Sequence, residues 1–128
     1  MAIKQISHIS VYVKNQNEAL RWYTEKLGFI KRDDDSQTMS GFRWLTVSPK
    51  DNDSVKIMLF DATQPEYTKK IGQGTMVVLD TGDCRKMCAE MKSKGVTILS
   101  GPEDVPWGVS AVFKDLYGNP YNLVERKD

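Results

Sequence analysis

The sequence predicts an α+β fold made of two βαβββ modules, each a strand, a helix and three further strands. Three observations predict it. The apolar period switches repeatedly between about two residues, as in strands, and about 3.6 residues, as in helices. The order of elements in the first half returns in the second half. Landmarks of the two halves keep a nearly constant spacing, because the helix caps Asn15 and Asp83 lie 68 residues apart and the helix-ending Gly28 and Gly95 lie 67 apart.

The first module is expected to span about residues 1–61. Alternating apolar residues predict a strand at residues 6–13. Asn15 can cap a helix, Glu18 three residues later completes a capping-box pattern, and Gly28 is placed to end the helix. Three more strands are then expected, at residues 29–32, 42–48 and 55–60.

Two charged features of this module are expected to be solvated. Asp33, Asp34 and Asp35 lack the spacing of a calcium-binding loop and therefore predict a polar turn. Arg43 precedes Trp44 in a predicted strand, so its side chain should point to the opposite face and into water.

The second module repeats the first after a linker at about residues 62–74, which is rich in turn-forming residues. It is expected to span about residues 75–128, with a strand at 75–79 and a helix capped by Asp83. Three more strands are expected, at residues 96–99, 109–114 and 121–125. Cys84 and Cys88 are interpreted as small apolar core residues on one helix face, because helical geometry aims them poorly for a disulfide.

Composition excludes several classes of protein. A chain of 128 residues with 40% apolar content is the size of one globular domain. Its formal charge of +1 does not suit a protein that binds nucleic acid or an anionic membrane surface. No segment resembles a signal peptide or a membrane span, so a cytoplasmic location is expected. The single histidine excludes a metal site built from several imidazoles of one chain.

The predicted strands of each module have one aliphatic face, which suits packing beneath a helix. Their other faces mix polar, aromatic and thioether side chains, as ligand cavities do. We therefore expect two curved sheets around a cleft. The candidate ligand-binding residues are His8, Tyr12, Phe42, Trp44, Met58, Phe60, Met76, Asp80, Trp107 and Asn122. Asp80 is suited to pair with a cationic group, and Trp107 to contact a ligand or a second subunit.

Three segments carry a resemblance to a known family: HISVYVKNQNEALRWYTEKLGF at residues 8–29, the shorter repeat that begins at Met76, and KDLYGNPYNLVE at residues 114–125. Together they resemble the vicinal oxygen chelate superfamily, the group of glyoxalases, bleomycin-resistance proteins and extradiol dioxygenases. The resemblance covers essentially the whole chain. It implies paired βαβββ modules, association into homodimers, and a substrate site on the concave sheet faces.

Metal-dependent members of that superfamily take ligands from the first and last strands of each module. The resemblance transfers those positions to His8, Met58, Met76 and Asn122. Only His8 suits a hard divalent cation, because a thioether is soft and a carboxamide oxygen is a weak ligand. Glu125 lies three residues beyond Asn122, so it should face the other side of its strand. We therefore expect no metal cofactor, and a divalent metal is disfavoured.

The leading hypothesis is metal-independent binding of a small aromatic molecule in the cleft, as in antibiotic-sequestering members of the superfamily. The sequence does not decide whether the protein is an enzyme, and two alternatives stay open. One is a glyoxalase-like lyase or dioxygenase-like enzyme whose diverged metal site is completed across a dimer. The other is a metal-free enzyme that uses His8 as its catalytic base. The expected partners are a small-molecule ligand and a second copy of the chain, without nucleic acid or membrane.

Overall fold

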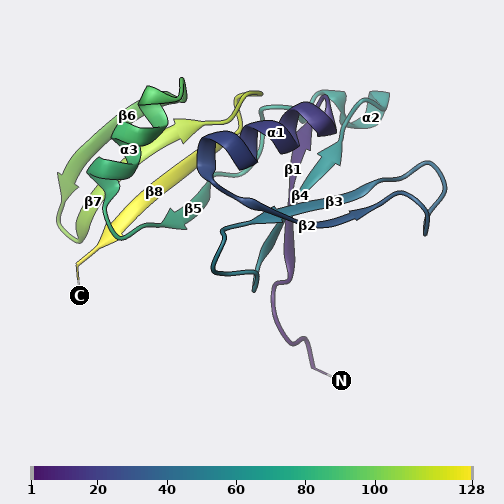
Figure 1. The fold of residues 1–128 in the computed structure, drawn as a ribbon, viewed down its shortest axis with the longest axis horizontal. Coiled ribbons are helices and arrows are strands. Elements are labelled where there is room, and N and C mark those ends of the chain that lie inside the picture. The colour runs from purple at the N-terminus through teal and green to yellow at the C-terminus, as the bar shows by residue number, and fades with distance from the viewer. Residues whose placement is uncertain (1, 128) are drawn as a thin grey trace. The chain divides into compact units, whose positions relative to one another are not determined.

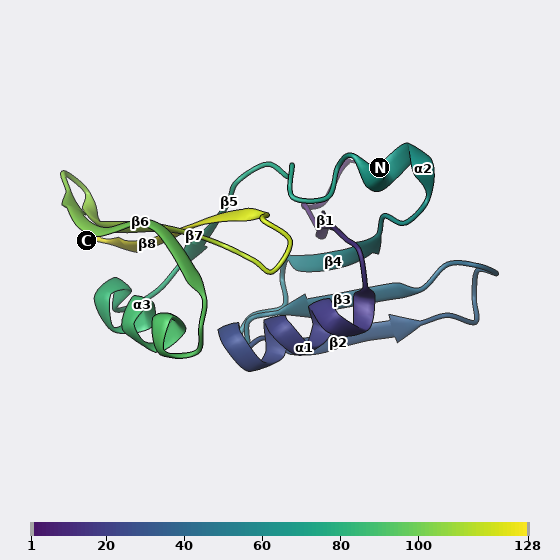
Figure 2. The ribbon, with the colours of Figure 1, turned by 90° about the horizontal axis from the view of Figure 1, so that it is seen from above.

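The computed structural model of the protein describes residues 2–127. The chain forms two compact units that divide between Ile71 and Gly72. Each unit has one four-stranded sheet and one long helix that covers one face of it (Figure 1). The predicted α+β fold class is confirmed. Both sheets are curved and open rather than closed into barrels (Figure 2).

The first unit contains the elements of the first predicted module and one short additional helix. Its sheet has the strand order β1-β4-β3-β2. The two strands farthest apart in the sequence, β1 and β4, pair in parallel, and the other pairs are antiparallel. The elements are β1 (His8–Val13), α1 (Gln16–Leu27), β2 (Ile30–Asp35), β3 (Trp44–Ser48), β4 (Lys56–Asp61) and α2 (Pro65–Thr68).

The second unit repeats this topology with the strand order β5-β8-β7-β6. Here β5 and β8 are the parallel pair, which corresponds to β1 and β4 in the first unit. The internal repeat that the sequence predicts is therefore a repeat of topology. The elements are β5 (Val77–Asp80), α3 (Cys84–Ser93), β6 (Thr97–Val105), β7 (Gly108–Lys114) and β8 (Pro120–Arg126).

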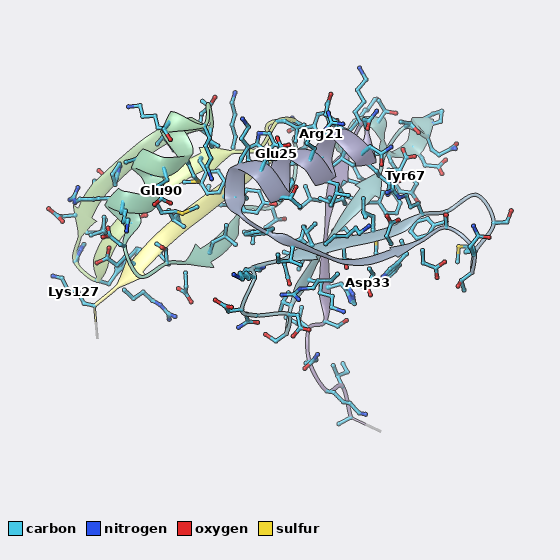
Figure 3. All side chains as sticks on the ribbon, in the orientation of Figure 1. Arg21, Glu25, Asp33, Tyr67, Glu90 and Lys127 are labelled. Carbon is cyan, nitrogen blue, oxygen red and sulfur yellow. The ribbon has the colours of Figure 1, made fainter. Side chains whose placement is uncertain are left out.

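Helix α1 forms where its capping residues predict. The Asn15 side chain accepts a hydrogen bond from the Glu18 amide, and Gly28 adopts the left-handed conformation, with φ +71°, that ends the helix. Ala19, Tyr23 and Leu27 are buried against the sheet. The charged Arg21 and Glu25 lie on the outer side of the same helix (Figure 3). One face of this sheet is thus covered by α1, and the other is open.

Helix α3 follows the same design in the second unit. The Asp83 side chain accepts a hydrogen bond from the Lys86 amide at its start, while Glu90 lies on the exposed side (Figure 3). Cys84 and Cys88 are buried and free, which confirms their interpretation as core residues. Burial raises the pKa of Cys84 to about 11, since it removes water from the thiolate.

The prediction of a solvated turn at Asp33, Asp34 and Asp35 is wrong, because these residues form the second half of β2. The strand tolerates three adjacent acids because neighbouring side chains bond them. The Thr46 hydroxyl donates to Asp33 at 2.6 Å, and Arg43 donates to Asp34 at 2.8 Å. Arg43 is accordingly half-buried in an ion pair rather than solvated.

Several strands begin two residues later than predicted, so that Phe42 and Met76 precede β3 and β5, and two other segments differ more widely. The segment predicted as a loop after residue 99 is the continuation of β6 to Val105, which pairs with β7 through irregular register. The predicted linker contains α2, which begins with Pro65 at its first turn. No α-helix among residues 2–127 is long and apolar enough to cross a lipid bilayer.

Candidate functional site

Six rings of the first unit form a chain of aromatic contacts, here called the aromatic network. Because β1 and β4 run in register, Tyr12 lies beside Phe60 on the sheet face that α1 does not cover. Five of the six rings were predicted as ligand contacts, and the sixth, Tyr67, comes from α2. The members are His8, Tyr12, Phe42, Trp44, Phe60 and Tyr67.

Phe60 is the centre of this network. Its ring centroid lies 4.9 Å from that of Tyr67, 5.3 Å from that of Tyr12 and 5.9 Å from that of Phe42. The first two contacts are edge-on, a favourable arrangement for aromatic pairs. Tyr12 and Tyr67 are nearly parallel, with 16° between their planes. These rings form a continuous apolar wall.

His8 lies at the other end of the network, beside Trp44. The two ring centroids are 5.1 Å apart, and the rings meet edge to face. His8 Nδ1 lies 2.8 Å from the Ser7 hydroxyl. Its Nε2 is buried and has no hydrogen-bond partner among the described residues. A buried polar atom without a partner carries an energetic cost, so a ligand group that bonded Nε2 would be favoured.

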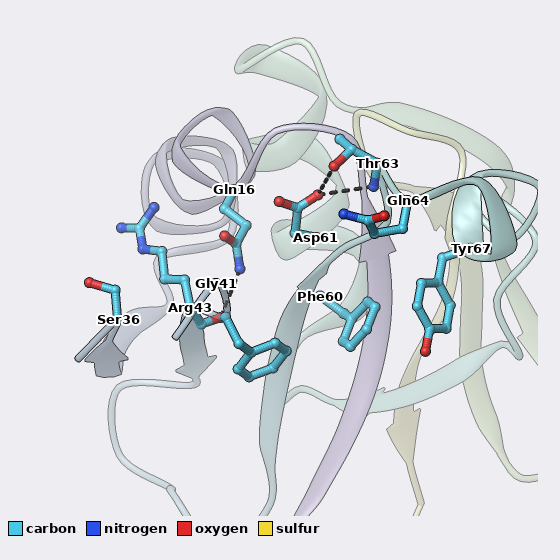
Figure 4. A pocket seen from close by; sticks show the side chains of 10 residues that line it. Gln16, Ser36, Gly41, Arg43, Phe60, Asp61, Thr63, Gln64 and Tyr67 are labelled. Atoms are coloured by element: carbon cyan, nitrogen blue, oxygen red, sulfur yellow. Dashed lines mark hydrogen bonds between the residues drawn. The ribbon is translucent and has the colours of Figure 1, made fainter. Parts of the chain in front are cut away.

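A hollow of about 480 Å³ opens beside the Phe60 end of the network (Figure 4). Phe42, Phe60 and Tyr67 make one wall of it. The other side is polar. Its remaining lining residues are Gln16, Ser36, Gly41, Arg43, Asp61, Thr63 and Gln64. Small-molecule sites typically combine an apolar wall with a few fixed polar groups in this way.

The polar side of the hollow is fixed by hydrogen bonds within the unit. The Gln16 amide nitrogen donates to the Leu59 carbonyl at 2.8 Å and to the Arg43 carbonyl at 3.1 Å. Asp61 accepts from both the amide and the hydroxyl of Thr63, at 2.9 and 2.7 Å. These bonds join the start of α1, β4 and the segment before β3. The hollow is therefore lined by side chains that already have defined positions.

The acidic Asp33 near the network is paired. Lys56 Nζ lies 3.3 Å from the Asp33 carboxylate, which also accepts the Thr46 hydroxyl. The Thr46 hydrogen bond, with a smaller contribution from Lys56, lowers the pKa of Asp33. Met58, also predicted as a ligand contact, pairs in register with Thr46 and is 7% exposed.

The other predicted contacts belong to the second unit. Met76 and Trp107 are 45% and 47% exposed. Asp80 is ion-paired with Arg126 at 2.8 Å. The Asn122 amide nitrogen donates to the Ser110 hydroxyl and the Ala111 carbonyl, at 2.9 and 2.8 Å. These four residues do not form an aromatic cluster in their own unit, so only the first unit carries a ring network among the predicted contacts.

Comparison with known proteins identifies the family. The family model described as the Glyoxalase/Bleomycin resistance protein/Dioxygenase superfamily matches residues 5–123. The chain belongs to this superfamily. The resemblance inferred from its sequence motifs is confirmed.

Individual relatives match nearly the whole chain. The solved structure of TnmS3, an antibiotic binding protein from Streptomyces sp. CB03234, is 34% identical with a TM-score of 0.84 and 99% coverage of both chains. A member from Sphaerobacter thermophilus is 28% identical, with a TM-score of 0.84 and coverage of 97% of this chain and 98% of that chain. YurT of Bacillus subtilis strain 168 is 39% identical, over 91% of this chain and 95% of its own length.

The metal-ligand positions implied by the superfamily do not fit a metal here. Met58 and Met76 offer neutral thioethers, and Asn122 offers a neutral carboxamide oxygen, which is a weak ligand for a hard divalent cation. The Cys84 amide donates to Glu125 Oε1 at 2.8 Å, so Glu125 faces α3, as predicted, and not the open face. Among residues 2–127 no three His, Cys, Asp or Glu residues are grouped to hold a metal ion. We derive no chemical step through a metal.

Tyr67 was not among the residues predicted to contact a ligand. It lies in the predicted linker, where no apolar alternation indicates which way a side chain points. The signal that was available is Pro65 followed by Glu66, a typical helix start, two residues before an aromatic side chain. A helix there gives Tyr67 a fixed direction.

Proposed function

We propose that the protein binds a small planar aromatic molecule at the aromatic network and hollow of the first unit, without a metal. The observation that carries the proposal is the contact of Phe60 with Tyr12, Phe42 and Tyr67 beside a hollow of about 480 Å³. Such a wall buries and stacks on a flat ligand, and the opposite polar side orients it.

Two further observations support sequestration rather than metal-dependent catalysis. The donor set at the four implied ligand positions is chemically unsuited to a hard cation. TnmS3, which matches 99% of this chain at 34% identity, is described as an antibiotic binding protein. We therefore propose that this chain also binds an antibiotic-like small molecule, and its aromatic wall favours an aromatic one.

Intrinsic fluorescence tests the proposal. Trp44 lies 6.3 Å from Phe42 and 5.1 Å from His8 by ring centroids, so a ligand at the network changes its surroundings. The chelator-treated protein is titrated with 1-naphthalenemethanol and related planar probes. We expect a saturable change in emission that Trp44→Phe removes and Trp22→Phe retains, since Trp22 packs on Tyr23 of α1.

Two outcomes contradict this proposal. The first is a set of planar aromatic probes that produces no saturable change in the wild-type protein. The second is binding that disappears on chelation and returns with one divalent metal per chain by elemental analysis. In the second case the metal-dependent lyase or dioxygenase alternative replaces sequestration.

A metal-free enzyme with His8 as base is a second candidate, favoured by the buried Nε2 that has no hydrogen-bond partner among residues 2–127. His8→Ala separates the two functions. For sequestration we expect probe binding within a few-fold of wild type and no turnover in either protein. For catalysis we expect turnover by the wild type that the variant loses.

The homodimer and the cytoplasmic location remain expectations from the sequence and the family. We propose the homodimer because members of the superfamily commonly pair. Sedimentation velocity across a range of protein concentrations tests it. A sedimenting species with the mass of one 14.5 kDa chain at all concentrations would contradict it.

A further inference from the structure

Lys70 is the cation of the first unit that lies directly against the aromatic network. Its Nζ is 5.3 Å from the centroid of the Tyr12 ring and 5.6 Å from that of the Tyr67 ring, within the range of a cation–π contact. No carboxylate of residues 2–127 lies within ion-pair distance of it. Its charge is therefore not neutralised by an acid among the described residues.

The position of Lys70 is held by the backbone around α2. Its amide donates to the Tyr67 carbonyl at 2.8 Å. The Thr68 hydroxyl donates to the Ala62 carbonyl at 3.2 Å, and the Ala62 amide donates to the Val13 carbonyl at 2.9 Å. These bonds tie α2, and Lys70 two residues after its end, to the ends of β1 and β4. The ammonium is thus presented at the ring wall by a fixed support, although the side chain itself is exposed.

We infer that the ligand of this site carries an acidic group, a carboxylate or an ionised phenol, which pairs with Lys70 while its rings stack on Tyr67 and Phe60. This inference rests on the proposed function and adds to it the chemical class of the ligand. Tyr67 links Lys70 to the hollow, because its ring lines the hollow and also contacts the Lys70 ammonium.

The contacts that a cationic and an acidic ligand can make with Lys70 and the rings favour the acidic ligand. A cationic ligand would have to displace Lys70 from the rings, exchanging one cation–π contact for another with no net gain. An acidic ligand keeps that contact and adds a charge-assisted hydrogen bond to the ammonium. Lys70 is not itself among the lining residues of the hollow; it reaches the site through its contact with Tyr67. Of the charged residues that line the hollow, Arg43 pairs with Asp34, and the Asp61 carboxylate is held by two hydrogen bonds from Thr63. Lys70 is therefore the cation at the rings that we assign to select the charge of the ligand.

Three probes of one shape test this inference: 1-naphthoate, neutral 1-naphthalenemethanol and cationic 1-naphthalenemethylamine. We expect the chelator-treated protein to bind naphthoate roughly tenfold more tightly than the other two, as a charge-assisted hydrogen bond at a part-exposed site allows. Raising the salt concentration from about 50 to about 500 mM should weaken the binding of 1-naphthoate, because salt screens an exposed charge pair. The affinity for the neutral 1-naphthalenemethanol should not change.

Variants assign the preference to one side chain. Lys70→Met keeps a side chain of similar size and removes its charge. It should lower the affinity for 1-naphthoate roughly tenfold and leave the affinity for 1-naphthalenemethanol within twofold of wild type. Lys70→Arg should keep the naphthoate preference. Lys69→Met is the matched control, since Lys69 is an exposed neighbouring lysine that makes no cation–π contact with these rings, and this variant should bind all three probes like wild type.

The outcomes separate this inference from the proposed function. Two outcomes overturn the acidic-ligand inference and leave aromatic binding in place. One is that 1-naphthalenemethanol binds as tightly as 1-naphthoate, and the other is that the preference for 1-naphthoate persists in Lys70→Met. Tightest binding of the methylamine overturns it as well. Failure of all three probes to bind overturns both.

Discussion

Arg43 and Asp34 form a two-point ion pair beside the hollow. Arg43 Nε donates to Asp34 Oδ1 at 2.8 Å, and one terminal nitrogen donates to Oδ2 at 2.9 Å. The backbone carbonyl of the same arginine accepts the Gln16 side chain. The sequence predicts that both residues are solvated. In the structure their ion pair instead holds the segment before β3, which lines the proposed site.

This pair predicts a pH-dependent stability. Hydrogen bonding to Arg43 lowers the pKa of Asp34 from 3.8 to about 2. Above about pH 5 the ionised pair stabilises the fold fully, and Asp34→Asn should cost about 1 kcal/mol, as for a well-aligned, partly exposed pair. As the pH falls toward 2, the unfolded chain binds the proton first, so the difference between wild type and variant should shrink toward zero.

Urea unfolding of both proteins at several pH values between about 2 and 7 measures this difference. Asp51→Asn, a substitution of an exposed aspartate in a turn, serves as the control and should change stability little at any pH. A difference between wild type and Asp34→Asn that stays constant over the whole range would contradict the assignment of the pair.

The ring of Tyr67 is predicted to contribute to ligand binding by stacking. Tyr67→Leu removes the ring and should weaken binding of 1-naphthalenemethanol roughly fivefold, corresponding to about 1 kcal/mol of aromatic contact. Tyr67→Phe keeps the ring and should bind within twofold of wild type. Calorimetric or fluorescence titration distinguishes them, and equal affinities for the Leu and Phe variants would remove Tyr67 from the site.

Two glycines with similar backbone conformations are predicted to differ in their tolerance of alanine. Gly28 and Gly72 have φ values of +71° and +77°. A Cβ at Gly28 meets nothing within 4 Å, whereas one at Gly72 would collide with the Tyr117 carbonyl oxygen. Gly28→Ala should therefore cost about 1 kcal/mol of backbone strain, and Gly72→Ala about 3 kcal/mol through strain and collision together. Urea unfolding compares them, and equal costs would contradict the close packing of Gly72.

The thiols of α3 are predicted to be unreactive in the folded protein. Cys84 is fully buried and Cys88 is 3% exposed, and burial raises the pKa of both. Because the thiolate is the reactive form, a disulfide reagent at about pH 8 should label neither thiol in the native state and both in guanidinium chloride. Rapid labelling of the folded protein would show that α3 opens or that its packing is different.

The fold was predictable from sequence because local signals agreed with one another. Asn15 and Gly28 delimit α1, and both have the conformations that capping requires. Ile9, Val11 and Val13 alternate on the face that a helix covers, which fixes the direction of His8 and Tyr12 on the other face. The helix caps, the apolar alternation of the strands and the spacing of the internal repeat all indicate the same architecture of two modules, so it could be predicted.

The site was predictable only in part, because some of its residues depend on pairing between distant segments. Asp33 and Asp34 belong to a strand that pairs with β3, where Thr46 and Arg43 bond them, and nothing within the acidic run indicates these partners. Tyr67 and Lys70 lie in a segment without alternation, so their contact with Tyr12 follows from tertiary structure alone. The sequence therefore predicted the rings in and beside the strands of the first unit, but not Tyr67 and Lys70, which follow β4.

The most direct test of metal-free aromatic binding by the first unit is a residue-resolved titration. An assigned ¹H–¹⁵N spectrum of the chelator-treated protein is recorded while 1-naphthalenemethanol is added. We predict saturable shifts concentrated at Tyr12, Trp44, Phe60 and Tyr67, the rings that line or adjoin the hollow. Absence of saturable shifts at these four residues, or their appearance only after a divalent metal is added, would contradict the account.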